Sequence, residues 1–196
     1  FVENYCVTWA ERLAPAAEIS EQISQAGTEA SGTSNMKFMI NGAVTLGTLD
    51  GANVEIHEAV GDDNMILFGM TTPEVENLKA AGYHPDQIYQ NNTAVHKAID
   101  FLRGGLNGVD FGDIVRSLTT SDPYMVLADF ESYQKAQNRA VELYQNATHW
   151  QQMCLTNIAN AGIFAADRAI REYAQKIWHC TPVPSMAAKV PAQDQQ

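Results

Sequence analysis

Residues 27–55 read GTEASGTSNMKFMINGAVTLGTLDGANVE, a loop rich in glycine, threonine and serine that runs into an apolar segment. The apolar residues between Asn35 and about Thr48 cover most of a helical circumference, which predicts a buried helix. Consecutive backbone N–H groups at a helix N-terminus, together with the helix macrodipole, bind anions. That position here holds four small polar residues: Gly32, Thr33, Ser34 and Asn35. The pattern indicates a phosphate cradle, although the same residue types also cap helices that bind nothing.

Lys37 stands one helical turn inside this predicted anion-binding end, between Met36 and Phe38. A lysine held in an apolar pocket loses hydration, which lowers its pKa and frees the amine to attack an aldehyde. The alternative is a lysine that extends its charged head into solvent. A phosphate cradle and an amine within one turn suit pyridoxal phosphate, which carries both an aldehyde and a phosphate.

Glu29 is the one carboxylate in this loop. A carboxylate among backbone donors can accept hydrogen bonds from sugar hydroxyls. It can equally cap the loop or face solvent, and the sequence leaves both roles open. Asp50, Gly51 and Asn53 follow the predicted helix, and we interpret them as residues that shape the loop.

Outward from this stretch, alternating strands and helices predict part of a doubly wound, Rossmann-like α/β domain with a helical C-terminal pack. The expected strands are FVENYCV, ANVEIHEAV and NMILFG, and the expected helices before residue 72 are TWAERLAP, SEQISQAG and 35–48. Every later segment, up to and including AADRAIREYAQKIW, is expected to be helical. Thr72 is expected to cap the first of these helices. The tail is expected to be loose.

The bulk composition narrows the classes of partner. The chain has 196 residues and a net charge of −11, which argues against nucleic acid and anionic membrane surfaces as partners. No apolar run reaches the roughly 20 residues of a membrane span, so a cytoplasmic protein is expected. We interpret the opening FVENYCV as a strand already under way and the chain as a piece of a longer protein.

Three further expectations concern single residue types. The cysteines Cys6, Cys154 and Cys180 are far apart and are expected to be reduced, structural thiols. The five histidines show no ligand spacing, so no metal site is expected. The three tryptophans, Trp9, Trp150 and Trp178, are expected in the core.

The stretch SEQISQAGTEASGTSNMKFMINGAVTLGTLDGANVEI closely resembles the pyridoxal-phosphate segment of the α-glucan phosphorylases, the glycogen, starch and maltodextrin phosphorylase family. FVENYCV, ILFG, GYHPDQIY, VLADFESY and NIANAGIFAADRAIREYAQKIW resemble further landmarks of that family, in the same order. The resemblance covers residues 1 to about 184 and identifies them as the C-terminal part of the cofactor-binding domain. Residues 185–196 are expected to be a flexible tail.

The resemblance implies a role for each matching residue. Lys37 would hold the aldehyde of pyridoxal phosphate, while Gly32, Thr33 and Ser34 would bind its 5′-phosphate. Tyr5 would pack near the pyridine ring. The glucosyl hydroxyls would be contacted by the loop residues Glu29, Ala30, Ser31 and Gly32.

The resemblance also implies an activity: phosphorolysis of α-glucan or maltodextrin with inorganic phosphate, giving α-glucose 1-phosphate, in a homodimeric whole enzyme. The chain lacks a cluster of arginine and lysine residues that could hold inorganic phosphate, so we predict that it is inactive alone. Two alternatives remain at this point. A nucleotide-sugar glycosyltransferase would want a second carboxylate where Lys37 stands, and a non-catalytic binding or assembly module would be indifferent to Lys37.

Overall fold

The computed structural model describes residues 1–181 and divides the chain into two units, Phe1–Gly162 and Ile163–Gln196. The first unit contains a sheet of three parallel strands in the order β1-β2-β3. These strands are β1 (Ile19–Gln22), β2 (Val44–Gly47) and β3 (Ile66–Leu67). Helix α2 (Ser34–Ile40) connects the first two strands and α3 (Asn53–Val60) connects the last two. The α/β, Rossmann-like fold expected from the sequence is confirmed.

The central strand shows why one predicted helix was wrong. α2 ends at Ile40, and Gly42, with a φ of 87°, turns the chain into β2. All four residues of β2 are buried. A short apolar run gives no periodicity that separates a buried strand from a buried helix. The expected helix over 35–48 is therefore a seven-residue helix followed by a strand.

Two segments have structures opposite to those predicted, a strand in place of a helix and a helix in place of a strand. Residues 20–27 were predicted as helix, but Ser20–Gln22 belong to β1, which pairs in parallel with β2, with Ile19 opposite Val44 and Gln22 opposite Gly47. Asn53–Val60 was predicted as strand but forms α3, whose buried Ile56 and Val60 are one helical turn apart. The predicted strand at residues 1–7 was also wrong, because Asn4 turns with a φ of 51° and α1 (Val7–Leu13) begins within it.

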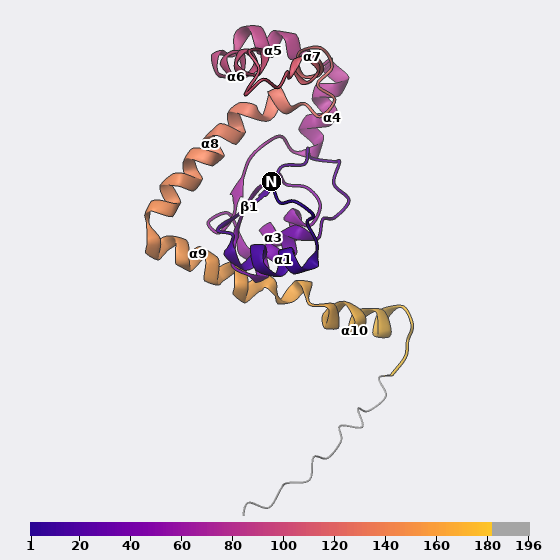
Figure 1. Ribbon diagram of the computed structural model, residues 1–196. Coiled ribbons are helices and arrows are strands. Elements are labelled where there is room, and N and C mark those ends of the chain that lie inside the picture. Colours follow the sequence, from indigo (N-terminus) through magenta and orange to yellow (C-terminus); the bar gives the residue numbers. More distant parts are fainter. Residues whose placement is uncertain (182–196) are drawn as a thin grey trace, which may run out of the picture. The chain divides into compact units, whose positions relative to one another are not determined.

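The remaining helices cover the sheet and extend from it (Figure 1). They are η1 (Ala14–Ala16), α4 (Thr72–Ala81), α5 (Pro85–Asn91), α6 (Thr93–Arg103), α7 (Gly112–Thr120), α8 (Val126–Gln145) and α9 (Ala147–Asn160). The expected helical character after residue 72 is confirmed for these segments. The cap of α4 is Thr71, not Thr72, since Thr71 and Glu74 form a reciprocal capping box.

Two of the clusters of buried side chains in this unit hold α6, α7, α8 and α9 in place. In the larger one, residues of β2 and β3 pack against α8 and α9: Val44, Leu46, Ile66, Phe68, Ala136, Ala140, Trp150 and Met153. In the other, α6 and α7 pack on the first turn of α8 through Val95, Ile99, Val115 and Leu127. Helices α8 and α9 therefore pack against the sheet that carries the loops at the ends of its strands.

The second unit contains α10 (Ala166–Lys176), which follows η2 (Ala161–Phe164). Glu172 forms ion pairs with Arg168 and with Lys176, the latter at 2.9 Å. Within residues 1–181, no helix combines the length and the apolar character that crossing a membrane requires. The tail predicted at 185–196 lies outside the described residues.

The tryptophan prediction holds for Trp150, which is buried between α8, α9 and the sheet. It is wrong for Trp9 and Trp178, which are 42% and 59% exposed. The cysteines are free thiols, but Cys6 and Cys180 are exposed, so neither packs in the core.

Candidate functional site

Two loops leave the same edge of the sheet, because the carboxyl ends of parallel strands lie side by side. Residues 23–33 follow β1, and residues 48–52 follow β2. The first loop contains most of the residues that the sequence singles out, and the second contains Asp50 and Gly51. Their mutual contacts decide where the first loop lies.

Asp50 fixes the backbone of the first loop. Its Oδ2 accepts hydrogen bonds from the backbone N–H of Thr28 at 3.1 Å and of Glu29 at 2.8 Å. Two residues further along each loop, the N–H of Ala52 donates to the carbonyl of Ser31 at 2.6 Å. The sequence-based interpretation of Asp50 as a loop-shaping residue is confirmed by these contacts.

Beneath this contact lies a buried pair of asparagines. Asn35 Nδ2 donates to Asn53 Oδ1 at 3.0 Å, and Asn53 Nδ2 donates to the carbonyl of Thr48 at 3.0 Å. Asn35 Oδ1 accepts from the N–H of Met36 at 2.9 Å. Buried amides need such partners, so this chain of bonds ties the first turn of α2 to the loop that follows β2.

Two glycines permit the close approach of the loops. A Cβ on Gly51 would stand 2.6 Å from the carbonyl oxygen of Ser31, and the φ of Gly51 is 51°. Gly32 has a φ of 86°, and a Cβ there would stand 3.1 Å from the side chain of Asn35. Both positions require glycine for conformation as well as for space.

Glu29 is held at its backbone and exposed at its side chain. Its Oε2 accepts from Ser24 Oγ at 3.4 Å, and it borders a narrow polar recess of about 10 Å³ shared with Asp50 and Thr48. A recess of that size holds at most one water molecule. Ala30 and Ser31 are exposed on the outer side of the loop. A sugar would therefore lie on the surface of this loop, not within the recess.

A larger hollow of about 690 Å³ lies between α1 and α2. It is lined by four of the predicted cofactor residues: Tyr5, Thr33, Ser34 and Lys37. The apolar part of its wall comes from α1, η1 and α2, including Val7, Leu13, Pro15 and Phe38. The structure thus brings together residues that are up to 32 positions apart in the sequence, from Tyr5 to Lys37.

Lys37 itself is exposed, so of the two alternatives that the sequence left open, the lysine that extends into solvent is the one found. The predicted helix over residues 35–48, with apolar residues around most of its circumference, does not form. Its last apolar residues belong to β2 instead. The lysine stands instead at the open side of a hollow whose wall is largely apolar. Its backbone carbonyl accepts from Asn41 Nδ2 at 2.8 Å, which fixes the end of its helix.

The donors of this hollow suit a phosphorylated aldehyde. Thr33 is the N-cap of α2, yet its hydroxyl makes no capping bond and is left for a ligand. Ser34 Oγ accepts from Gln22 Nε2 at 3.3 Å, which leaves its own O–H to donate. An amine, two hydroxyls and an aromatic ring thus border one space, so the residues present fit pyridoxal phosphate.

Comparison with known proteins gives the chain its family. The phosphorylase family model, described as carbohydrate phosphorylase, matches residues 1–180. The chain belongs to the carbohydrate phosphorylase family. The resemblance inferred from the motifs around Lys37 is thereby confirmed.

Curated phosphorylases align along nearly the whole chain. A glycogen phosphorylase of Synechocystis sp. is 48% identical over 187 residues, which cover 93% of this chain and 22% of that protein. The muscle form of Rattus norvegicus is 45% identical over 200 residues, covering 100% of this chain and 23% of that protein. A glycogen phosphorylase of Haemophilus influenzae is 47% identical over 187 residues, covering 93% and 23%. This phosphorylase chain therefore spans less than a quarter of the length of these relatives.

Sequence reasoning missed part of this candidate site. It gave no role to Asn35 beyond the cradle, and none to the residues of α1 that wall the hollow. The signal for the asparagine pair was weak, because Asn35 and Asn53 are 18 positions apart and meet only once the sheet has formed. No group of three or more His, Cys, Asp or Glu side chains gathers as a metal centre within residues 1–181.

Proposed function

We propose that this chain forms the pyridoxal-phosphate-holding part of an α-glucan phosphorylase. The observation that carries the proposal is the hollow shared by Tyr5, Thr33, Ser34 and Lys37. Membership of the carbohydrate phosphorylase family supports it. A glycosyltransferase that uses nucleotide sugars finds no comparable support, since a lysine stands where it would want a carboxylate.

Each lining residue has a role in this proposal. Lys37 attaches the cofactor covalently through its amine, and Tyr5 packs against the ring of the cofactor. Thr33 and Ser34 donate hydroxyl hydrogens to the 5′-phosphate, and Gly32 lets the backbone approach it closely. When bound, the cofactor supplies a phosphate group able to donate and accept a proton beside the sugar phosphate.

The loop after β1 presents the sugar-binding groups. Glu29 accepts hydrogen bonds from glucosyl hydroxyls, and Ala30, Ser31 and Gly32 line the same stretch. Asp50 contributes by holding the backbone N–H groups of Thr28 and Glu29, so the loop keeps its shape without a ligand.

In the whole protein the proposed reaction is phosphorolysis of α-glucan to α-glucose 1-phosphate. The chain spans 22–23% of its relatives, and its arginines, such as Arg103 and Arg139, are exposed and scattered. We therefore expect no release of glucose 1-phosphate by the 196-residue chain alone. The homodimeric state and the cytoplasmic location expected from the sequence stay predictions.

The phosphate cradle is tested by comparing pyridoxal phosphate with pyridoxal in a spectroscopic titration of the chain. We expect pyridoxal to bind at least about tenfold more weakly, since the loss of charge-assisted hydrogen bonds costs roughly 1.5–3 kcal/mol. Thr33→Val should weaken binding of pyridoxal phosphate and leave pyridoxal unchanged. The control is Thr93→Val, at the exposed first residue of α6. Equal affinities for the two compounds would contradict the proposed cradle.

A further inference from the structure

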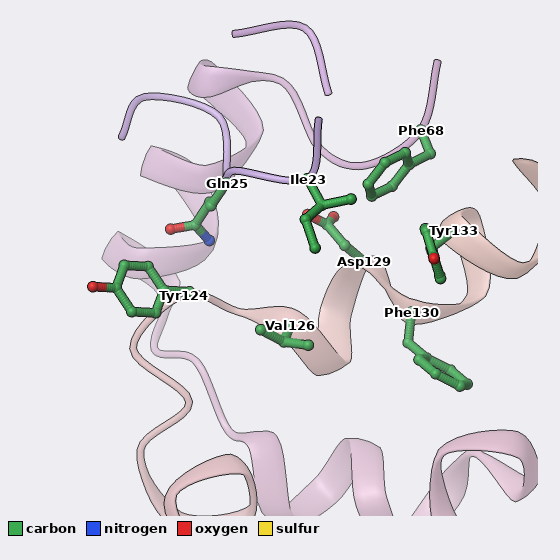
Figure 2. A pocket seen from close by; sticks show the side chains of 8 residues that line it. All are labelled: Ile23, Gln25, Phe68, Tyr124, Val126, Asp129, Phe130 and Tyr133. Carbon is green, nitrogen blue, oxygen red and sulfur yellow. The ribbon is translucent and has the colours of Figure 1, made fainter. Parts of the chain in front are cut away.

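A second cavity, of about 290 Å³, lies between α8 and the loops that follow β1 and β3 (Figure 2). Four aromatic residues form much of its wall: Phe68, Tyr124, Phe130 and Tyr133. Two polar residues, Gln25 and Asp129, also line it. Figure 2 shows Phe68, Tyr133 and Phe130 on one side, Gln25 and Tyr124 on the other, and Asp129 between them. None of these six residues belongs to the hollow beside Lys37.

The amide of Gln25, in the wall of this cavity, lacks hydrogen-bond partners in the part of the chain described. Gln25 is 5% exposed, and within residues 1–181 neither its Nε2 nor its Oε1 has a hydrogen-bond partner. Leaving a buried amide without partners is costly. Gln25 therefore contributes an enclosed, unsatisfied amide to the wall of this cavity.

Asp129 is a buried acid, 8% exposed, in acidic surroundings. Its Oδ1 accepts from the N–H of Met70 at 2.9 Å. No lysine, arginine or histidine forms an ion pair with it in the part of the chain described. Burial raises the pKa of Asp129, and the nearby carboxylates of Asp122 and Glu74 raise it further. A cation bound beside Asp129 would relieve both effects.

The aromatic wall is fixed in place before any ligand binds. The hydroxyl of Tyr133 donates to Glu21 Oε2 at 3.0 Å and accepts from Gln137 Nε2 at 2.9 Å. Its ring meets Phe68 edge-on, with 5.1 Å between centroids. Aromatic faces attract cations, most strongly where water is excluded. A rigid aromatic wall next to an unpaired buried carboxylate is therefore suited to an organic cation.

We propose that this cavity binds a small organic cation, an ammonium group carried on an apolar body. The ammonium donates to the carboxylate of Asp129, and the apolar body packs among Phe68, Phe130 and Tyr133. No covalent step is involved. The inference rests on these residues alone and does not depend on the function proposed above.

The test uses the full chain, with 2-phenylethylamine as the probe and 2-phenylethanol as its neutral counterpart. Binding is followed by the amide NMR shift of Met70, whose N–H is bonded to Asp129. We expect saturable binding of the amine at pH 7 and at least about tenfold weaker binding of the alcohol. Equal affinities, or no saturable shift at Met70, would overturn the proposal.

Variants assign the effect to the cavity. Asp129→Asn keeps an acceptor for Met70 and removes the charge, so the preference for the amine should disappear. Glu142→Gln removes an equal charge from an exposed position of the same helix and should leave the preference intact. Phe130→Leu should weaken binding of the amine by about threefold, in line with the loss of one cation–π contact. Retention of the preference in Asp129→Asn, or its loss in Glu142→Gln, would contradict the assignment.

Discussion

The two parts of the proposed phosphorylase site are held in different ways. The loop after β1, which we propose binds the sugar, is tied to the turn after β2 by Asp50, by the contact of Ala52 with Ser31 and by the buried asparagine pair. The hollow around Lys37 is walled on one side by α1, a helix of seven residues with none buried. The loop is thus fixed by contacts made where the strands of the sheet end, whereas the wall of the hollow is held by few contacts.

The two regions therefore depend on different contacts: the loop on the pairing of strands, and the hollow around Lys37 on the packing of one short helix. The geometry of the loop follows from strand pairing, because Gln22 and Gly47 are register partners and the loops begin directly after them. The hollow depends on where α1 lies against α2, which packing constrains less. Substitutions in the loop should therefore affect folding, and substitutions around Lys37 should affect binding.

The largest expected effect is that of Gly51→Ala. A Cβ at this position would stand 2.6 Å from the carbonyl oxygen of Ser31, and the backbone φ of 51° is unfavourable for alanine. We therefore expect a loss of about 3 kcal/mol in the free energy of unfolding. Chemical denaturation measures it. The matched control is Gly61→Ala, since Gly61 also has a positive φ of 75° but nothing within 4 Å of its Cβ. A loss of about 1 kcal/mol is expected there. Equal losses would show that the close approach of the two loops is unimportant.

A smaller loss is expected for Asp50→Ala, which removes the acceptor of two backbone N–H groups. The loss should be about 2 kcal/mol, because hydrogen bonds to a charged group are worth roughly 1.5–3 kcal/mol each and water replaces part of them. Limited proteolysis should cut the chain within residues 23–33 faster than in the parent chain. Asp63→Ala, at an exposed turn, serves as the control and should show neither change. An uncut loop in Asp50→Ala would mean that the asparagine pair suffices.

The loop after β1 also contains the unpartnered Gln25, and here the expected change has the opposite sign. Gln25→Leu keeps the volume and removes two buried polar atoms that lack partners, so we expect a gain of about 1 kcal/mol in stability. Thermal unfolding measures the gain. A loss of stability would indicate that the amide is hydrogen-bonded in solution.

The smallest effect on stability is expected for Lys37→Met. The lysine side chain is exposed, so the melting temperature should change by no more than about 1 °C. Lys79→Met, at an exposed position of α4, is the comparison and should behave alike. A marked destabilisation by Lys37→Met alone would mean that the lysine supports the hollow structurally.

The sequence grouped residues that line one hollow, but it misassigned several of the elements that hold them. Thr33, Ser34 and Lys37 are neighbours in the chain, so a local motif was sufficient to group them. Val44–Gly47 and Ile19–Gln22 were misassigned because their structure is decided by pairing with each other, which no local pattern contains. The sequence left open whether Lys37 is buried or exposed, because the predicted helix around it, residues 35–48, was longer than α2.

Long-range contacts account for the other features that the sequence did not predict. The approach of Tyr5 to Lys37 depends on how α1 packs, and the Asn35–Asn53 bond depends on the order of the strands. Trp9 and Trp178 occur in sequences with helical periodicity. That pattern indicates an apolar face but not whether another element covers it, and both side chains are exposed. Trp150 is buried because α8, α9 and the sheet meet around it.

The central claim is that Lys37 is the residue to which pyridoxal phosphate attaches. The most direct measurement is to incubate the chain with pyridoxal phosphate, reduce it with borohydride, digest it and locate the adduct by mass spectrometry. We predict modification at Lys37, absent from the Lys37→Met variant and suppressed by excess inorganic phosphate, which competes for Thr33 and Ser34. Label spread over Lys79, Lys97, Lys135 and Lys176, or no label at all, would contradict the account.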